Sequence, residues 1–463
     1  MTNKAPQTKQ LSPRAKVIAL LVQIQTGKSL ATLMPTLLAT GAVPDKDKAF
    51  VHELLLGTLR QWWALCRIID SLADSEIYDD TAKAGLAVGL YQLLFMGVPD
   101  YAAIFDTVEA LKQLGKERFA SLCNAILRKV AKNPQKFAKK ASKNHSLPNW
   151  LAKRLKQDWG EYYADMGQTL RQSAPIFLRV NTSFTTVDDY ANLLAQQGIA
   201  FEKVATGFVG NATDNSVFSS ALRLMDNVKI TDLPHFADGW VSVQDLHAQL
   251  SAQILTSLTL KKATVLDACT APGGKLAHLL ELFHVEQCTQ LIALDNDQTR
   301  LNRVKDNLER LRLQDGRVKL VCDDATTFCS DKPFDLIVLD APCTATGVIR
   351  RHPDINLLRT DDDVARTTAL QNAILTNCWQ NLADNGYLLY ITCSLLKAEN
   401  ERQIQAFLAC EPNAVAVEFT LTLLNQIKQD VGYQCLPLDI NDGDGFYYAL
   451  LQLSLIHISE PTR

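Results

Sequence analysis

The feature that most constrains the fold is a regular alternation of apolar strands and amphipathic helices in the C-terminal half of the chain. Runs such as ATVLDA, LIALDN, FDLIVLDA and GYLLYITC are almost continuously apolar, and segments with helical periodicity such as TRLNRVKDNLERL separate them. Strands of this kind are buried on both faces, which is typical of a mostly parallel, doubly wound sheet. We therefore predict an α/β domain over residues 236–453, with its ligand outside the carboxyl ends of the strands.

The rest of the chain predicts two further domains. Residues 1–145 repeat apolar side chains at three- and four-residue spacing, which indicates an all-α bundle, and Ser12 before Pro13 is a suitable helix start. Over residues 146–235, the strand-like IFLRVN and FEKVA flank the helical DDYANLLAQQG, which predicts a small α/β module. Residues 454–463, SLIHISEPTR, are unlike everything before them, and we interpret them as a non-native tail.

Composition excludes several classes of protein. Hydrophobic residues make up 47% and charged residues 21% of the chain, with a net charge of −3, as in ordinary globular proteins. No apolar run approaches the length of a membrane span, and the polar opening residues do not resemble a secretory signal. The eleven cysteines contain no CxxC pair, so we expect reduced thiols, a cytoplasmic location and no metal site.

Positive charge is concentrated between Lys112 and Asp158. This segment has thirteen Lys or Arg residues and two acidic residues, and Trp150 and Trp159 lie among them. One interpretation is a solvated helix face followed by a linker. The other, which we favour, is a nucleic-acid surface on which the cations bind phosphates and the tryptophans stack on bases.

A second set of residues lies at the predicted carboxyl ends of the strands. The first strand runs into the glycine-rich turn that ends at Lys275, and this turn matches neither the dinucleotide nor the phosphate-loop fingerprint. The next strand ends at Asp295, where an acid accepts hydrogen bonds from ribose hydroxyls, and the third ends at Asp323 and Asp324, which suit an adenine amino group. A nucleoside-bearing cofactor, S-adenosyl-L-methionine, fits this pattern; the alternative is a structural turn with helix-capping acids.

Two cysteines, Cys343 and Cys393, also follow strands at this edge, and Asp340 precedes the first of them. A thiolate that adds to carbon 6 of a pyrimidine makes carbon 5 nucleophilic enough to take a methyl group. An acid that protonates ring N3 stabilises this adduct, and Asp340 is suited to that role. Position alone does not decide which cysteine is the nucleophile.

The motifs DACTAPGGK, DAPCTATGVIRRHPDI and YITCSLLKAEN resemble those of the RNA cytosine-5 methyltransferases of the Nol1/Nop2/Sun family. The likeness is strongest to the bacterial members that modify 16S ribosomal RNA. GTLRQWWALCRIIDSL and the segment from YQLLFMGVPDY to NAILRKV resemble their N-terminal NusB-like RNA-binding domain. The resemblance covers nearly the whole chain. It implies an all-α NusB-like bundle, a small α/β module that contacts RNA, and a Rossmann-like class I methyltransferase domain.

The resemblance also implies roles for individual residues. Cys393 is the expected nucleophile, Cys343 assists release of the product, and Asp340 lies near both the methyl donor and the base. Asp295 is expected at the ribose and Asp324 near the adenine, with Asp323 as the alternative. The cofactor loop is expected to comprise Cys269, Thr270, Ala271, Pro272, Gly273, Gly274 and Lys275.

The sequence departs from the family pattern at Thr270 and Thr344, and both replacements are small. The segment Arg350, Arg351 and His352 is either a solvated surface or, as we favour, a contact with RNA phosphates. The resemblance implies that a single-stranded or flipped cytosine in 16S ribosomal RNA is the substrate, and we expect a monomer without a membrane or DNA partner. The alternatives are the same chemistry on transfer RNA or large-subunit RNA, and a non-catalytic RNA-binding or assembly factor.

Overall fold

The computed structural model describes residues 11–39, 43–143, 145–204, 221–421 and 425–454. The chain divides into two compact units, one formed by Met1–Gln172 with Ile349–Thr360 and the other by Ser173–Val348 with Asp361–Arg463. Almost all of the proposed tail at residues 454–463 lies outside the described residues. No helix in the described ranges is long and apolar enough to cross a membrane.

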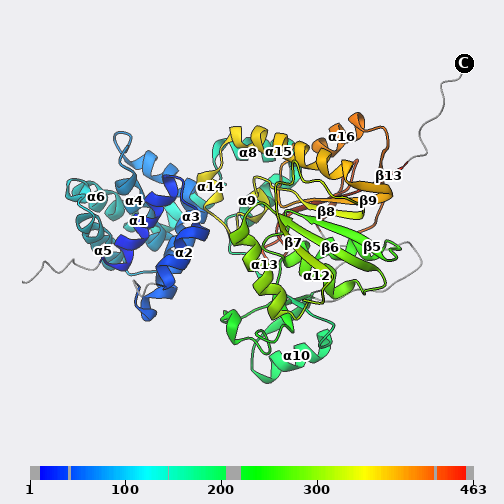
Figure 1. The fold of residues 1–463 in the computed structure, drawn as a ribbon. Coiled ribbons are helices and arrows are strands. Elements are labelled where there is room, and N and C mark those ends of the chain that lie inside the picture. The colour runs from blue at the N-terminus through cyan, green and yellow to red at the C-terminus, as the bar shows by residue number, and fades with distance from the viewer. Residues whose placement is uncertain (1–10, 40–42, 144, 205–220, 422–424, 455–463) are drawn as a thin grey trace, which may run out of the picture. The chain divides into compact units, whose positions relative to one another are not determined.

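The first unit is helical, as the sequence predicts (Figure 1). Ser12 caps the first helix, because its hydroxyl accepts a hydrogen bond from the Ala15 amide at 3.3 Å. The hydrophobic core of the unit is built mainly from the apolar faces of the longer helices. The helices are α1 (Pro13–Gln25), α2 (Leu30–Ala39), α3 (Asp45–Leu72), α4 (Asp80–Tyr91), α5 (Asp100–Gln113), α6 (Ala120–Ala131), α7 (Pro134–Lys143), α8 (Asn149–Trp159), α9 (Tyr163–Thr169) and α14 (Ile355–Leu358), with a π-helix at Gln92–Met96 and 3-10 turns at Glu117–Phe119 and Gly160–Tyr162.

The segment Ile349–Thr360, which follows the predicted Cys343 loop in sequence, belongs to this helical unit. The guanidinium of Arg60 on α3 donates two hydrogen bonds to the backbone carbonyl of Arg350, at 3.1 and 3.0 Å. The Trp63 indole donates to the carbonyl of Asn356 at 3.1 Å. Arg350 is fully buried, so the expected phosphate contact is wrong for this residue: its neighbours are protein atoms of the bundle, because α3 satisfies the backbone of the segment.

The basic segment Lys112–Asp158 extends from the end of α5 to α8. On α7, Phe137 and Ala141 are buried, and the lysines of the opposite face are exposed. Trp159 is only 5% exposed and packs inside the protein, so the prediction that it stacks on bases is wrong. It lies on the apolar face of α8, which the charge pattern of the sequence does not distinguish from the solvated face. Trp150 is half-buried.

The second unit begins at Ser173 with a small α/β module, whereas residues 146–172, which contain α8 and α9, lie in the first unit. The module contains a sheet in the order β2-β3-β1-β4 with antiparallel pairing. Its strands are β1 (Ile176–Val180), β2 (Phe201–Val204), β3 (Ala221–Leu224) and β4 (Val241–Val243). Helix α10 (Val187–Gln196) packs its buried residues, Tyr190, Ala191 and Leu194, into the core of the module.

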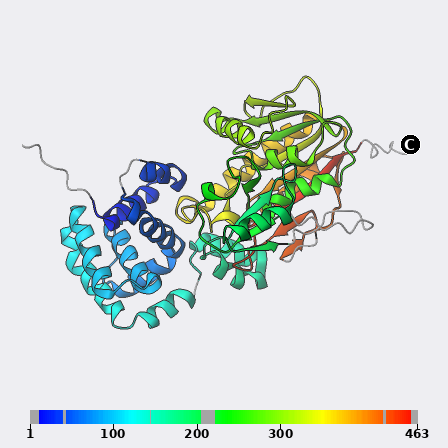
Figure 2. The same ribbon diagram turned by 90° about the horizontal axis from the view of Figure 1, so that it is seen from below.

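The larger sheet runs in the order β11-β12-β13-β9-β8-β5-β6-β7, and β10 pairs with β13 (Figures 1 and 2). The strands from β5 to β9 are parallel, as predicted, whereas β13 joins β9 antiparallel. The strands are β5 (Ala263–Ala268), β6 (Cys288–Asp295), β7 (Val318–Cys322), β8 (Phe334–Asp340), β9 (Leu382–Thr392), β10 (Ala414–Val417), β11 (Gln426–Lys428), β12 (Tyr433–Cys435) and β13 (Phe446–Leu453).

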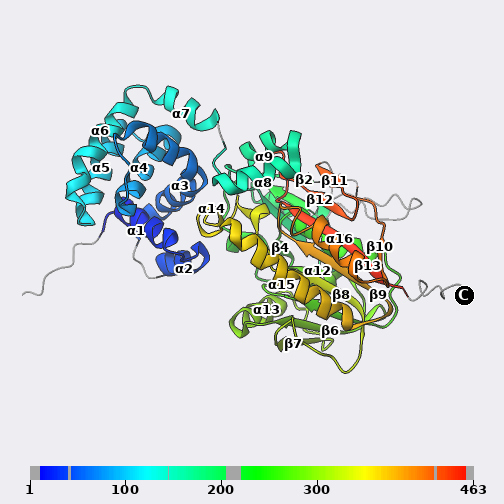
Figure 3. The ribbon, with the colours of Figure 1, turned by 90° about the horizontal axis from the view of Figure 1, so that it is seen from above.

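Helices cover both faces of this sheet (Figure 3). One core lies between the sheet and α11 (Leu250–Thr256), α12 (Gly274–Leu282) and α13 (Gln298–Arg310). The other lies between the sheet and the pair α15 (Asp361–Gln380) and α16 (Glu401–Cys410). This layering is the doubly wound architecture that the strand–helix alternation predicts.

Candidate active site

The loop that follows β5 forms one wall of the site. Asp267 near the end of β5 is buried, and its carboxylate accepts a hydrogen bond from the Thr270 hydroxyl. Gly273 has a φ of 88°, and a Cβ there would lie 3.0 Å from the Val304 side chain, so this turn requires glycine. Helix α12 then begins at Gly274, so the backbone amides of its first turn lie next to this loop, at the carboxyl edge of the sheet.

The acids that follow β6 and β7 reach the same edge. Asp295 is 3% exposed, and its carboxylate accepts hydrogen bonds from the backbone amides of Ala271 and Asp297, each at 3.1 Å. Asp295 therefore connects the end of β6 to the loop after β5. Asp324 is exposed and accepts a hydrogen bond from the Thr326 amide at 2.8 Å.

The two cysteines come together at the ends of β8 and β9. Their sulfur atoms, Sγ of Cys343 and Sγ of Cys393, are 3.4 Å apart, which is within hydrogen-bonding distance for thiols. The amide of Gly347 donates to the carbonyl of Cys393 at 2.9 Å. A Cβ on Gly347 would lie 2.4 Å from the Gly445 carbonyl oxygen, so the close packing of these loops requires glycine.

A lysine and an aspartate complete the polar part of the site. Lys275 Nζ lies 2.6 Å from a carboxylate oxygen of Asp340 and 5.4 Å from the centre of the Phe446 ring. Burial alone would lower the pKa of Lys275, but the negative charge and hydrogen bond of Asp340 outweigh burial and raise it. Lys275 is therefore a permanent cation beside Asp340, and the charge of Cys393 also acts on it.

A cavity of about 310 Å³ lies in the second unit, with Asp295, Asp324, Asp340 and both cysteines in its wall. Many predicted site residues lie in its wall, but Thr270, Pro272, Gly273, Gly274, Lys275 and Asp323 do not. Asn296, Arg300, Leu370 and Ile374 also line the cavity and were not among the predicted site residues. Leu370 and Ile374 lie on α15, where apolar residues have the spacing of ordinary core residues. The lining residues are Cys269, Ala271, Asp295, Asn296, Arg300, Asp324, Ala325, Asp340, Ala341, Pro342, Cys343, Ala345, Leu370, Ile374 and Cys393.

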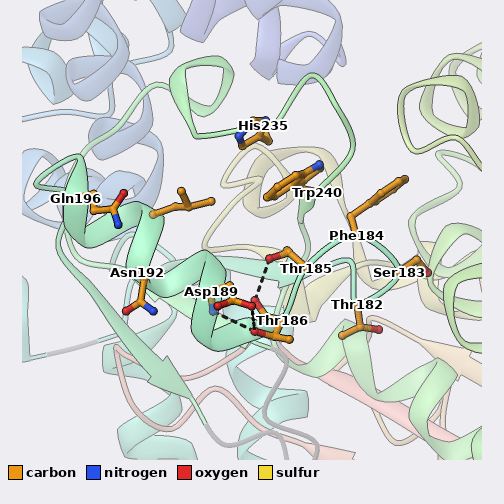
Figure 4. A pocket seen from close by; sticks show the side chains of 11 residues that line it. Thr182, Ser183, Phe184, Thr185, Thr186, Asp189, Asn192, Gln196, His235 and Trp240 are labelled. Carbon is orange, nitrogen blue, oxygen red and sulfur yellow. Dashed lines mark hydrogen bonds between the residues drawn. The ribbon is translucent and has the colours of Figure 1, made fainter.

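A larger, open cavity of about 740 Å³ lies in the small α/β module (Figure 4). The Trp240 ring stacks on His235 at one side, with 4.1 Å between the ring centroids, and Asp189 hydrogen-bonds to Thr186 at the other. The described residues that line it include the acid Asp189 and no Lys or Arg, although the Arg312 guanidinium lies 5.5 Å from the centre of the Phe184 ring in its wall. None of the predicted site residues lines it.

The buried carboxyl of Asp267 is a further site residue that the predicted cofactor loop did not include. Burial raises its pKa to about 7, and the neighbouring carboxylates of Asp340 and Asp295 add to this effect, whereas the hydrogen bond from Thr270 opposes it. Its second oxygen, Oδ1, has no hydrogen-bond partner among the described residues. A cationic group of a ligand would compensate the ionised form of this carboxyl.

We expect the Asp267→Asn variant to be more stable than the parent protein above pH 7 in the absence of ligand. The folded state holds the Asp267 proton up to about pH 7, whereas the unfolded chain releases it near pH 4. Between these pH values ionisation stabilises only the unfolded chain, so the parent's free energy of unfolding falls as the pH rises. The gain of the variant should therefore be smallest near pH 4 and largest above pH 7. Urea unfolding across this range measures it. The matched control is Asp306→Asn on the exposed face of α13, and a gain independent of pH would contradict the prediction.

The parallel sheet with helices on both faces, the cavity at its carboxyl edge and the family models that match the chain together define the class: a Rossmann-like methyltransferase with an N-terminal helical bundle. The chain belongs to the 16S rRNA methyltransferase RsmB/F family, whose model matches residues 255–452. The NusB family matches residues 11–132, and the ferredoxin-like domain of RsmF/B-like methyltransferases matches residues 147–210.

Relatives extend the match to almost the full chain. Ribosomal RNA small subunit methyltransferase B of Serratia proteamaculans is 40% identical over 445 residues, which cover 94% of this chain and 96% of the relative. The protein of the same name from Pasteurella multocida is 39% identical, with 97% and 98% covered. A crystal structure of a methyltransferase homologue from Pyrococcus horikoshii has a TM-score of 0.53 at 25% identity and covers 65% of this chain and 94% of that one.

Proposed function

We propose that this protein transfers a methyl group from S-adenosyl-L-methionine to carbon 5 of a specific cytosine in 16S ribosomal RNA. The observation that carries the proposal is the 3.4 Å approach of Cys343 and Cys393, beside Asp340, in the wall of one cavity. Two thiols and a carboxyl are the groups that covalent catalysis at a pyrimidine requires. The named relatives are ribosomal RNA small subunit methyltransferases, which supports the choice of RNA.

The cavity suits the proposed methyl donor. Its volume is at the lower limit of small-molecule sites, and its wall combines the carboxylates of Asp295 and Asp324 with the apolar side chains of Leu370 and Ile374. We assign the ribose to Asp295 and the adenine to Asp324. The cofactor, when bound, supplies an electrophilic methyl group.

The chain's own residues activate the base. The Cys393 thiolate adds to carbon 6 of the cytosine, and a proton shared between Asp340 and ring N3 stabilises the ring electrons, so that carbon 5 becomes the nucleophile that takes the methyl group. A base, water or the Asp340 carboxylate, then takes the proton from carbon 5, and the electrons of that C–H bond restore the double bond between carbons 5 and 6. The bond between carbon 6 and Cys393 breaks at the same time, so that Cys393 leaves as a thiolate and ring N3 gives up the shared proton. We assign assistance in this release to Cys343, whose sulfur already contacts that of Cys393.

We propose a division of labour among the predicted domains. Residues 1–145 and 146–235 bind ribosomal RNA, and residues 236–453 carry out the reaction. The exposed lysines of α7 and the neighbouring basic residues of α6 and α8 supply the charge that phosphates require. The substrate cytosine is single-stranded or flipped out of its helix. We propose that the protein acts in the cytoplasm as a monomer.

Bisulfite sequencing of unmodified 16S ribosomal RNA, after incubation with the protein and S-adenosyl-L-methionine, tests this function. We expect one cytosine to become protected from conversion. Protection of transfer RNA or large-subunit RNA in parallel reactions would reassign the substrate. If no RNA is protected, the proposal of catalysis fails and a non-catalytic RNA-binding role takes its place.

We expect Asp295→Ala to weaken binding of S-adenosyl-L-methionine by about 10- to 100-fold. The reason is that a buried carboxylate that accepts hydrogen bonds from the ribose hydroxyls forms charge-assisted hydrogen bonds, which the variant lacks. Isothermal titration calorimetry measures the affinity. Asp306→Asn on α13 is the control for a change in net charge alone. An unchanged dissociation constant for the Asp295 variant would contradict the assignment of the ribose.

A further inference from the structure

Glu399 lies in the loop between β9 and α16 and is fully buried. Its Oε1 accepts a hydrogen bond from the Thr344 amide at 2.8 Å, and its Oε2 accepts one from the Thr344 hydroxyl at 2.5 Å. The Ser394 hydroxyl also donates to Oε2. The side-chain amide of Gln371 approaches Oε1 at 3.4 Å. This carboxyl is surrounded by donors, which is the arrangement that compensates an ionised carboxylate in the protein interior.

Apart from Gln371 on α15, the donors belong to the two cysteine loops. Thr344 directly follows Cys343, and Ser394 directly follows Cys393. One carboxylate therefore holds the two loops whose sulfur atoms are 3.4 Å apart. Glu399 itself is not part of the wall of the methyl-donor cavity, and Gln371, which also donates to the Pro342 carbonyl at 3.0 Å, connects the network to that wall. Its contacts indicate that Glu399 acts through the cysteine loops and not on the substrate.

The charges around the two sulfur atoms are unequal. The pKa of Cys343 lies well above the usual thiol value. The largest causes are the hydrogen bond with Cys393, burial and the charge of Cys393, and the negative charge of Glu399 adds to them. Lys275 contributes a positive charge that interacts with Cys393. Asp340, the remaining acid of this group, is paired with Lys275 at 2.6 Å. The negative charge therefore lies on the side of Cys343, and this arrangement favours the thiol form of that residue.

We propose that Glu399 is a positioning residue: it joins the two cysteine loops and places a negative charge beside Cys343, so that the two sulfur atoms differ in reactivity. The catalytic meaning of this asymmetry rests on the proposed function, since it assigns the nucleophile. The asymmetry itself is a property of the free protein. It is therefore measurable without RNA, cofactor or turnover.

The experiment is alkylation of the free protein with iodoacetamide over a range of pH, with each cysteine quantified by peptide mass spectrometry. In the parent protein we expect Cys393 to react at lower pH than Cys343. In Glu399→Gln, the midpoint for Cys343 should fall by about one pH unit or more, because a like charge close to a thiol raises its pKa by an amount of this order. The exposed Cys329 serves as an internal reference and should not shift.

Glu401→Gln is the matched control, because Glu401 is also buried but contacts Lys397 and the Asp430 amide instead of the cysteine loops. This variant should leave both midpoints unchanged. If Glu399→Gln does not fold, as judged by circular dichroism, Glu399→Asp and Ser394→Ala repeat the measurement with smaller changes at the same network. We expect a smaller shift in the same direction from each.

An unchanged Cys343 midpoint in folded Glu399 variants, or earlier alkylation of Cys343 than of Cys393 in the parent protein, would overturn the proposal. Failure of 16S ribosomal RNA methylation would overturn the proposed function and leave the alkylation result valid. The two failures are therefore distinguishable.

Discussion

Replacement of Cys393 by alanine should lower methyl transfer to RNA by more than about 10³-fold, because the variant lacks the thiol that we assign to the bond with carbon 6, which makes carbon 5 reactive. Binding of S-adenosyl-L-methionine should remain within about twofold of the parent value, since the variant loses only one sulfur atom from the cavity wall. Transfer of a labelled methyl group to RNA measures the first quantity, and calorimetric titration measures the second.

The matched control is Cys329→Ala, because Cys329 is exposed and lies outside the cavity. This variant should retain full activity. Residual methylation above a few per cent in the Cys393 variant, with unchanged folding, would exclude Cys393 as the nucleophile and direct attention to Cys343.

Replacement of Cys343 by alanine should have the opposite signature: the protein should remain attached to its RNA. With the partner sulfur at 3.4 Å removed, the bond between Cys393 and carbon 6 still forms, but its release is slowed. We expect a band that survives denaturing electrophoresis and contains both RNA and protein. Its amount should approach one equivalent of enzyme when S-adenosyl-L-methionine is present.

The double variant Cys343→Ala with Cys393→Ala provides the control, since it lacks the sulfur that forms the adduct. It should show no retarded band. A Cys343 variant that turns over normally without accumulating an adduct would contradict the release role, although it would leave the assignment of Cys393 intact.

Much of this site could be predicted from the sequence because its residues lie at strand ends. Asp295 ends β6, and Cys343 and Cys393 follow β8 and β9, so a parallel sheet brings them to one edge whatever the details of packing. The wall that contains Leu370 and Ile374 could not be predicted in this way. Both residues have the helical spacing of core positions, and only the packing of α15 decides which of them line a cavity.

Glu399 shows the same limit more strongly. In the sequence it is one acidic residue in a loop, and an acid in a loop is usually solvated. In the structure it is fully buried and connects Thr344 with Ser394, residues that are fifty positions apart. Trp159 shows a similar limit. It occurs beside charged residues in the sequence, which suggested exposure, but it is buried in the fold.

The sequence by itself determined the doubly wound sheet, the helical bundle and the meeting of the two cysteines, because periodicity and strand-end position are local properties that a parallel sheet converts into proximity. Only the tertiary structure decided that Ile349–Thr360 belongs to the helical bundle, where Arg60 binds the Arg350 carbonyl, and that Glu399 joins the cysteine loops. The physical reason is that buried polar groups must find partners, and those partners come from whichever distant segments the packing brings close.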